Sequence, residues 1–177
     1  VNHLTRLGHQ HIAVLLPPEK VAFTPYRLAG YRDGLEDAGL PFRDEYVLHS
    51  DLSRSGGQQA ARHLLENFPK ISAIVACNDP MAIGAMNAVQ SRQMRVGHDI
   101  AVTGFDDIPA ADFTHPRLTT VRQPIREIGQ RLLEMLIQII HQVPLEEPQV
   151  LLSPELVIRE SCGAGEQRKE AVSPAQK

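Results

Sequence analysis

The sequence has few cysteines and no long apolar run, and both absences narrow the class of protein. Its 177 residues include two cysteines, Cys77 and Cys162, far apart in the chain. Because disulfide-stapled proteins need a dense cysteine framework, this usage indicates free thiols in a reducing compartment. No apolar stretch approaches the roughly 18 residues of a membrane-spanning helix, and no signal peptide opens the sequence. We therefore expect a soluble, cytoplasmic protein with no membrane partner.

An excess of positive charge is also missing. The chain has 18 Lys and Arg against 21 Asp and Glu, which gives a formal net charge of −3. Nucleic-acid-binding domains usually carry a basic patch or stripe, and no such stripe is present in this sequence. These residues alone are therefore not expected to bind DNA.

The common catalytic signatures are absent too, since the sequence has no G-x-S-x-G, Walker loop, H-E-x-x-H or G-x-G-x-x-G. Two patterns in the sequence could indicate a metal site. Asp106-Asp107 would suit Mg²⁺ in a phosphoryl-transfer enzyme, but no lysine, threonine or third carboxylate follows at a recognisable spacing. His3, His9 and His11 would suit a metal cluster, but their places around a glycine-ended helix favour surface or capping roles. We expect neither an enzyme nor a bound metal or cofactor.

What the sequence does contain is an alternation of strand and helix patterns, which is clearest in the middle of the chain. The apolar run Ser72–Cys77 is typical of a strand buried on both faces. Asp79 as N-cap and Pro80 at the first helical position predict the start of a helix. A second apolar strand is predicted over Ile100–Phe105. Such a strand–helix–strand unit places two parallel strands close together.

The remaining elements continue this alternation. We expect helices over Val1–Gly8, Pro25–Ala38 (capped by Thr24), Ser53–Phe68 and Ile125–His141, and strands over His11–Leu16, Tyr46–His49, Thr119–Arg122, Val150–Leu152 and Leu156–Arg159. The alternation across residues 11–105 predicts an α/β fold with a doubly wound parallel sheet and helices on both faces. Residues 163–177 are polar and aperiodic, which predicts a disordered tail.

Three polar side chains are predicted to meet at the carboxyl ends of the parallel strands. Asn78 and Asp106 each follow a strand, and Arg27 lies in the first turn of the helix that follows another. Ligands of open parallel sheets bind beyond this edge. A carboxylate accepts hydrogen bonds from paired hydroxyl groups, a guanidinium donates them and an amide does either, so this set suits a hydroxyl-rich ligand.

Each of these residues also has a purely structural interpretation. Arg27 could be solvated or ion-paired, Asn78 could be a turn residue, and Asp106 could be a loop carboxylate or a cap for the next segment. Position alone does not choose between the two interpretations, and a sheet of this pattern hosts many functions.

Four blocks of sequence together carry a resemblance to a known family. In chain order they are LGHQHIAVL, YRLAGYRDGLEDAG, AIVACNDPMAIGAMNAVQSRQMRVGHDIAVTGFDD and LTTVRQPIREIGQRLLEML. In this order and spacing they resemble the effector-binding domain of the LacI/GalR family of bacterial transcription regulators. The resemblance covers about residues 2–160, and the longest block includes a strand followed by Asn-Asp-x-Met-Ala-x-Gly.

The resemblance implies a fold like that of type I periplasmic sugar-binding proteins, in which crossing strands join two α/β subdomains around the ligand. Residues 1–121 would be most of the second, carboxyl-terminal subdomain, and residues 122–162 the crossover, a helix of the first subdomain and closing strands. Family members carry a helix-turn-helix headpiece, a hinge and a first subdomain ahead of this point. We therefore expect a fragment or truncated product of a regulator, with half of a ligand cleft.

The same match assigns site residues. Arg27, Asn78 and Asp106 fall on positions that contact the effector, and Leu52 and Gln123 fall near positions that line the cleft. Several relatives have an aromatic ring that stacks on the ligand where this chain has Leu52. Phe23 is a candidate to take over that stacking.

The resemblance also implies partners. We expect a small polar effector such as a sugar, a homodimer, and operator DNA bound only through a headpiece outside this sequence. A solute-binding protein of a sugar transport system has the same fold and is the alternative. The helix over Ile125–His141 is apolar around more than one stripe, so more than one neighbour must cover it. Packing against the first subdomain would account for this.

Overall fold

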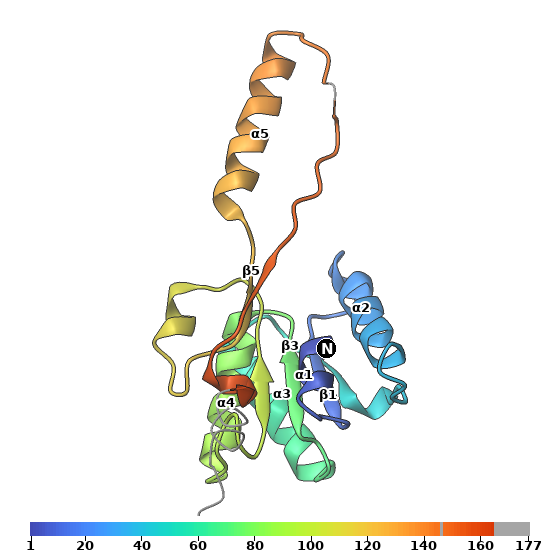
Figure 1. Ribbon diagram of the computed structural model, residues 1–177, viewed down its shortest axis with the longest axis vertical. Coiled ribbons are helices and arrows are strands. Elements are labelled where there is room, and N and C mark those ends of the chain that lie inside the picture. The colour runs from blue at the N-terminus through green and yellow to red at the C-terminus, as the bar shows by residue number, and fades with distance from the viewer. Residues whose placement is uncertain (146, 165–177) are drawn as a thin grey trace, which may run out of the picture.

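A four-stranded parallel sheet forms the centre of the molecule (Figure 1). The structure is a computed structural model that describes residues 1–145 and 147–164. The strand order is β2-β1-β3-β4, and all three pairings are parallel, which confirms the predicted α/β fold. The strands are β1 (Ile12–Leu16), β2 (Val47–His49), β3 (Ala73–Ala76) and β4 (Ala101–Thr103), and a separate antiparallel pair consists of β5 (Thr120–Arg122) and β6 (Glu155–Val157).

Helices cover both faces of the sheet because its central strands are apolar on both sides. All five residues of β1 are buried, as expected for a strand covered on both faces. The helices are α1 (Asn2–Arg6), α2 (Thr24–Glu36), α3 (Arg54–Asn67), α4 (Asp79–Ser91) and α5 (Ile125–Ile140). Figure 1 shows α3 and α4 side by side on one face, with α1 on the other and α2 beside it.

Two glycines allow α3 and α4 to approach each other at backbone distance. A Cβ atom on Gly84 would lie 2.0 Å from the carbonyl oxygen of Arg54, and one on Gly57 would lie 2.3 Å from that of Met81. Any larger residue at either position would push the helices apart. The face of α4 predicted from its 3-4 spacing is buried here, through Ala82, Ala85, Met86 and Val89.

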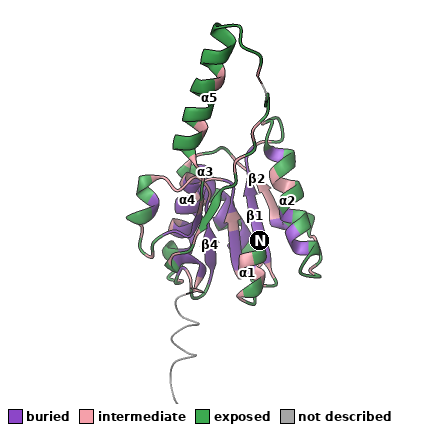
Figure 2. Ribbon diagram, turned by 45° about the horizontal axis from the view of Figure 1, so that its top comes forward, coloured by how far each residue is buried: buried purple, intermediate pink, exposed green. Residues whose placement is uncertain are grey.

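The helix α5 stands apart from the sheet. Figure 1 shows it pointing away from the body of the molecule at the end of the β5–β6 pair, and Figure 2 shows its surface as almost wholly exposed. None of its residues is buried. Its exposed apolar side chains are Ile125, Leu132, Leu133, Leu136, Ile137, Ile139 and Ile140. None of the helices in the described ranges is long and apolar enough to cross a lipid bilayer.

Several predicted boundaries were wrong. Asn78, not Asp79, is the N-cap of α4, and its side chain accepts from the backbone N–H of Met81. Thr24 does not cap α2 but is its first residue, and its hydroxyl donates to the carbonyl of Pro18. The helix ends at Glu36, so Ala38 lies beyond it and is exposed.

Strand lengths were also overestimated near the carboxyl end. β4 covers Ala101–Thr103 instead of Ile100–Phe105, and residues 150–152 form no strand. The late strand predicted over residues 156–159 is displaced to Glu155–Val157. Of the predicted disordered tail, residues 165–177 lie outside the described residues. The division of the chain into parts at residues 121 and 162 stays a prediction.

Candidate functional site

The carboxyl edge of the parallel sheet carries the predicted site residues. Asn78 follows β3 after one intervening residue, Asp106 lies in the turn after β4, and Arg27 lies in the first turn of α2, after β1. The turns after β3 and β4 are joined, because the backbone N–H of Asp79 donates to the carbonyl of Phe105 at 2.8 Å. The structure thus places the three residues at one edge of the sheet, as the parallel topology predicted.

Asn78 uses both ends of its side-chain amide inside the protein. Its Oδ1 accepts from the N–H of Met81 at 2.9 Å, and its Nδ2 donates to the carbonyl of Leu52 at 3.0 Å. The turn role considered from the sequence is therefore real. One amide proton and one oxygen lone pair remain available, so the same side chain can still contact a ligand.

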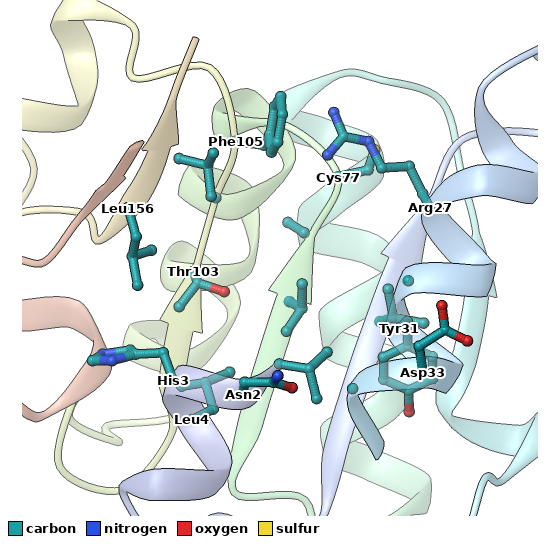
Figure 3. Close-up of a pocket in the computed structure, with 18 of the residues that line it drawn as sticks. Asn2, His3, Leu4, Arg27, Tyr31, Asp33, Cys77, Thr103, Phe105 and Leu156 are labelled. Atoms are coloured by element: carbon teal, nitrogen blue, oxygen red, sulfur yellow. The ribbon is translucent and has the colours of Figure 1, made fainter. Parts of the chain in front are cut away.

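Arg27 rests on an aromatic ring. Its guanidinium carbon lies 3.4 Å from the centroid of the Phe105 ring (Figure 3). Burial lowers the pKa of Arg27, and the neighbouring Cys77 and Asp106 oppose this shift. Sequence considerations allowed a solvated or ion-paired arginine, but the structure shows a half-buried, stacked one. Stacking leaves the planar edge of N–H groups free to donate.

Asp106 is held by Gln123, the residue after β5. The Nε2 of Gln123 donates to Oδ1 of Asp106 at 2.6 Å, and the backbone N–H of Asp106 donates to the carbonyl of Val121 at 2.9 Å. Two residues predicted for the site are thus in direct contact. Among the described residues, no side chain donates a hydrogen bond to Oδ2 of Asp106, which leaves this atom available to accept from a hydroxyl group.

The two apolar candidates lie beside these groups. Leu52 is 38% exposed and Phe23 is 42% exposed, so both residues are partly accessible to solvent. The carbonyl of Leu52 is the one that Asn78 holds, and the carbonyl of Phe23 accepts from the N–H of Arg27 at 3.1 Å. Neither side chain is fixed by a ring contact in the described structure.

Three residues support the site in ways that the sequence did not indicate. Asp79 is fully buried, and its carboxylate accepts from the hydroxyl of Thr120 at 2.5 Å and from the N–H of Ile108 at 2.8 Å. Burial raises the pKa of Asp79, although both hydrogen bonds oppose this. Phe105 supports Arg27, and Asp107 binds two arginines. For Asp79, the only signal in the sequence is its position just before Pro80, and that position predicts a helix cap.

A cavity of about 560 Å³ lies against the sheet face below Arg27. Figure 3 shows Arg27, Cys77 and Phe105 at one end and His3 and Leu4 of α1 at the other. Asn78, Asp106 and Gln123 do not line it. The polar groups that suit a hydroxyl-rich ligand therefore lie on the rim, and the cavity meets them at Arg27.

The two metal alternatives have other partners in the structure. His3 contacts the thiol of Cys162 at 3.3 Å, His9 contacts Ser72 at 3.0 Å, and His11 contacts Tyr46 at 3.1 Å. Within residues 1–145 and 147–164, no group of three His, Cys, Asp or Glu side chains is placed to hold a metal ion. Asp107 lies between two guanidinium groups, which would repel a divalent cation.

Comparison with known sequences gives consistent matches. A family model described as a periplasmic binding protein-like domain matches residues 1–162. The ribose operon repressor of Escherichia coli (strain K12) is 37% identical over 160 residues, which cover 90% of this chain and 48% of that protein. The transcriptional regulator GalR of the same organism is 35% identical over 159 residues, covering 90% and 46%. The chain spans about half the length of the curated relatives it matches.

Solved structures agree with these matches. A regulatory protein of the LacI family from Chloroflexus aggregans superposes with a TM-score of 0.86 at 38% identity, covering 90% of this chain and 58% of that one. The complex of the regulator CelR with cellobiose has a TM-score of 0.85 at 31% identity, covering 90% and 49%. The lac repressor dimer bound to operator and the anti-inducer ONPF has a TM-score of 0.82 at 34% identity, covering 92% and 48%.

Proposed function

This chain belongs to the periplasmic binding protein-like domains of LacI/GalR-type transcription regulators, and we propose that it is the effector-binding part of such a regulator. Its effector would be a small, hydroxyl-rich molecule, a sugar or a sugar derivative. Binding would alter the affinity of a DNA-binding headpiece for its operator. The regulator would act in the cytoplasm as a homodimer, and residues 1–121 would form the second subdomain.

The observation that carries this proposal is the convergence of Arg27, Asp106 and Gln123 on one edge of the sheet. Gln123 holds one carboxylate oxygen of Asp106 and leaves the other available. Arg27 is stacked so that its N–H groups remain able to donate. A free acceptor beside a fixed donor is the arrangement that recognises a pair of neighbouring hydroxyl groups. Asn78, Leu52 and Phe23 would complete this side of the site.

The relatives of this chain favour a regulator over a solute-binding protein of a transport system. The named relatives reported above are transcription regulators, and the complex of one of them holds cellobiose. Effector identity in this chain would depend on Leu52 and Phe23, since they offer the apolar surface next to the polar groups. An aliphatic Leu52 gives less stacking area than an aromatic ring would.

The test is a sugar screen on the full-length protein by thermal shift, followed by calorimetry. The panel contains neutral mono- and disaccharides, including D-ribose and cellobiose, with inorganic phosphate and Mg²⁺ as comparison ligands. We expect saturable binding of at least one sugar. We also expect that sugar to change how strongly the full-length protein retards promoter DNA in a gel-shift measurement. Stabilisation by Mg²⁺ alone, with a hydrolase activity lost in Asp106→Asn, would contradict the proposal. Binding of no sugar would contradict it as well.

A further inference from the structure

Asp107 lies next to the proposed ligand carboxylate, and its own side chain joins two segments that are far apart in the sequence. Nε of Arg122, on β5, donates to Oδ2 of Asp107 at 2.7 Å. Nη1 of Arg159, which follows β6, lies 2.8 Å from Oδ1. One carboxylate therefore holds both crossing strands of the molecule to the turn after β4.

This pairing is largely removed from solvent. The side chains of Asp107 and Arg159 are 8% and 10% exposed, whereas that of Arg122 is 50% exposed. Burial alone would raise the pKa of Asp107, but the hydrogen bond from Arg122 and the charges of Arg159 and Arg122 hold it below the ordinary value. Oδ1 makes an ion pair with Arg159 without a well-directed hydrogen bond. Removing the carboxylate would leave the buried guanidinium without its main counter-charge.

The turn that contains Asp107 has a backbone that needs such support. Asp106 has φ +114° and Asp107 has φ +53°, so two successive non-glycine residues occupy the left-handed half of conformational space. The backbone N–H of Asp106 is held by Val121, on β5. The side chain of Asp106 then meets Gln123, while that of Asp107 meets the arginines. The geometry of one aspartate thus depends on the anchoring of the next.

A second ion pair at the same end of the molecule reaches Asp107 only indirectly, because Arg117 lies 3.8 Å from Asp112, which lies 3.2 Å from Arg159. Nη2 of Arg117 lies 2.7 Å from Oε1 of Glu160, and the two side chains are 54% and 49% exposed. Glu160 comes directly after Arg159, but the pair does not touch the turn at Asp106. It therefore provides a matched control for the effect of losing an ion pair in this region.

We propose that Asp107 is a positioning residue: through Arg122 and Arg159 it fixes the turn that presents Asp106, so that effector affinity depends on the placement of β5 and β6. This inference rests on the proposed function, because it takes Asp106 as an effector contact. It adds a physical link from the ligand to the strands that carry α5. A ligand that draws on Asp106 would favour one placement of those strands over another.

The first measurement is hydrogen exchange at the backbone amides of residues 105–108 in the ligand-free, full-length protein. Asp107→Asn removes the charge, Arg122→Gln removes the more exposed partner, and Arg117→Gln is the control. We expect about tenfold faster exchange of this segment in the first two variants and no change in the control. Arg122→Gln keeps the test decisive if Asp107→Asn does not fold. Unchanged exchange at residues 105–108 in Arg122→Gln would overturn the proposal.

The second measurement is the affinity for the sugars of the panel, with D-ribose and cellobiose measured by calorimetry. Arg122→Gln should weaken binding about tenfold, which is about 1.4 kcal/mol, while Arg117→Gln should not. Asp107→Asn should also weaken binding, and Asp107→Glu should keep part of the affinity that Asp107→Asn loses, because it keeps the charge. If the wild type binds a sugar and Arg122→Gln binds it equally well, this proposal fails and the proposed function stands. If the wild type binds no sugar, the proposed function fails, and exchange at residues 105–108 still decides whether Asp107 supports the turn.

Discussion

Arg27 occupies a costly position that the structure compensates locally. A cation in the first turn of a helix opposes the helix dipole, by about 0.3–1 kcal/mol, and its partial burial adds a desolvation cost. The ring of Phe105 and the carboxylate of Asp106 offset these costs. The guanidinium of Arg27 thus stays in the first turn of α2 in spite of a free-energy cost, and its N–H groups can still donate. This arrangement is well suited to bind a ligand.

Arg27→Ala should therefore remove effector binding while leaving the fold stable. We expect affinity for the sugar found in the screen to fall by at least about tenfold, because a charge-assisted donor is lost. Calorimetry measures this change. Arg32→Ala is the matched control, since Arg32 lies on the same helix and stacks on Phe42 at 4.3 Å. Equal affinities of wild type and Arg27→Ala would remove Arg27 from the site.

Asp79 gives the protein a specific pH response. Burial raises its pKa above the ordinary value of 3.8, so the folded state binds this proton more tightly than the unfolded state. Its contribution to stability is therefore greatest below pH 3.8 and is lost as the pH rises through the folded pKa. The free energy of unfolding of wild type, relative to Asp79→Asn, should rise as the pH is lowered from neutral.

Urea unfolding of both proteins between about pH 7 and pH 4 measures this difference, because taking the difference cancels the titration of groups that do not interact with Asp79. Gln138→Ala, an exposed change at a position that does not titrate, should show no such trend. A difference that stays constant or falls toward low pH would contradict the inferred direction.

The residues predicted from the sequence were those whose signal is local. Asn78 and Asp106 could be found because each follows a strand and parallel strands deliver such residues to one edge. Phe105 and Asp107 could not, since their roles depend on partners about 80 and 50 residues away, Arg27 and Arg159. Asp79 was misinterpreted because an acidic residue before Pro80 has the same local pattern whether it caps a helix or binds Thr120.

At the scale of elements, the sequence predicted the existence and order of β3, α4 and β4, although β4 is shorter than expected. Their burial follows directly from an apolar run, a 3-4 spacing and a second apolar run. The start of α2 was wrong because Thr24 satisfies the usual N-cap pattern, yet its hydroxyl binds Pro18 six residues earlier. A loop contact of this kind competes with capping and leaves no periodic trace in the sequence.

The contact between α3 and α4 should be sensitive to a single methyl group. Gly84→Ala should lower the free energy of unfolding by about 1–3 kcal/mol, since its Cβ would meet the backbone of Arg54. Gly129→Ala is the control, because a Cβ there meets nothing within 4 Å and the position lies in an exposed helix. The control should stabilise by about 0.5–1 kcal/mol. Urea unfolding compares the two, and equal effects would show that the helices are not packed at backbone distance.

At the scale of the whole molecule, α5 presents a large apolar surface that the described residues do not cover. The chain as given should therefore bind a hydrophobic dye or self-associate through Leu132, Leu136 and Ile140, which lie on one face at i+4 spacing. Dye fluorescence and light scattering measure this.

Leu136→Glu should reduce the dye signal and the association without lowering the unfolding midpoint, because Leu136 is 52% exposed. Gln138→Glu adds the same charge at another exposed position of α5 and should have little effect. A monomer that binds no dye would mean that α5 folds back onto the body of the molecule.

The chain leaves the body of the molecule along β5 and returns along β6, so α5 is connected to that body by two strands. A ladder of bonds joins Thr120–Arg122 to Glu155–Val157, and these bonds would be sheared by twisting but only slightly disturbed by flexing of the ribbon across its flat side. The β5–β6 pair should therefore resist rotation about its length more than it resists bending. A body packed on α5 would therefore be held by two strands at once, one before the helix and one after it in the chain.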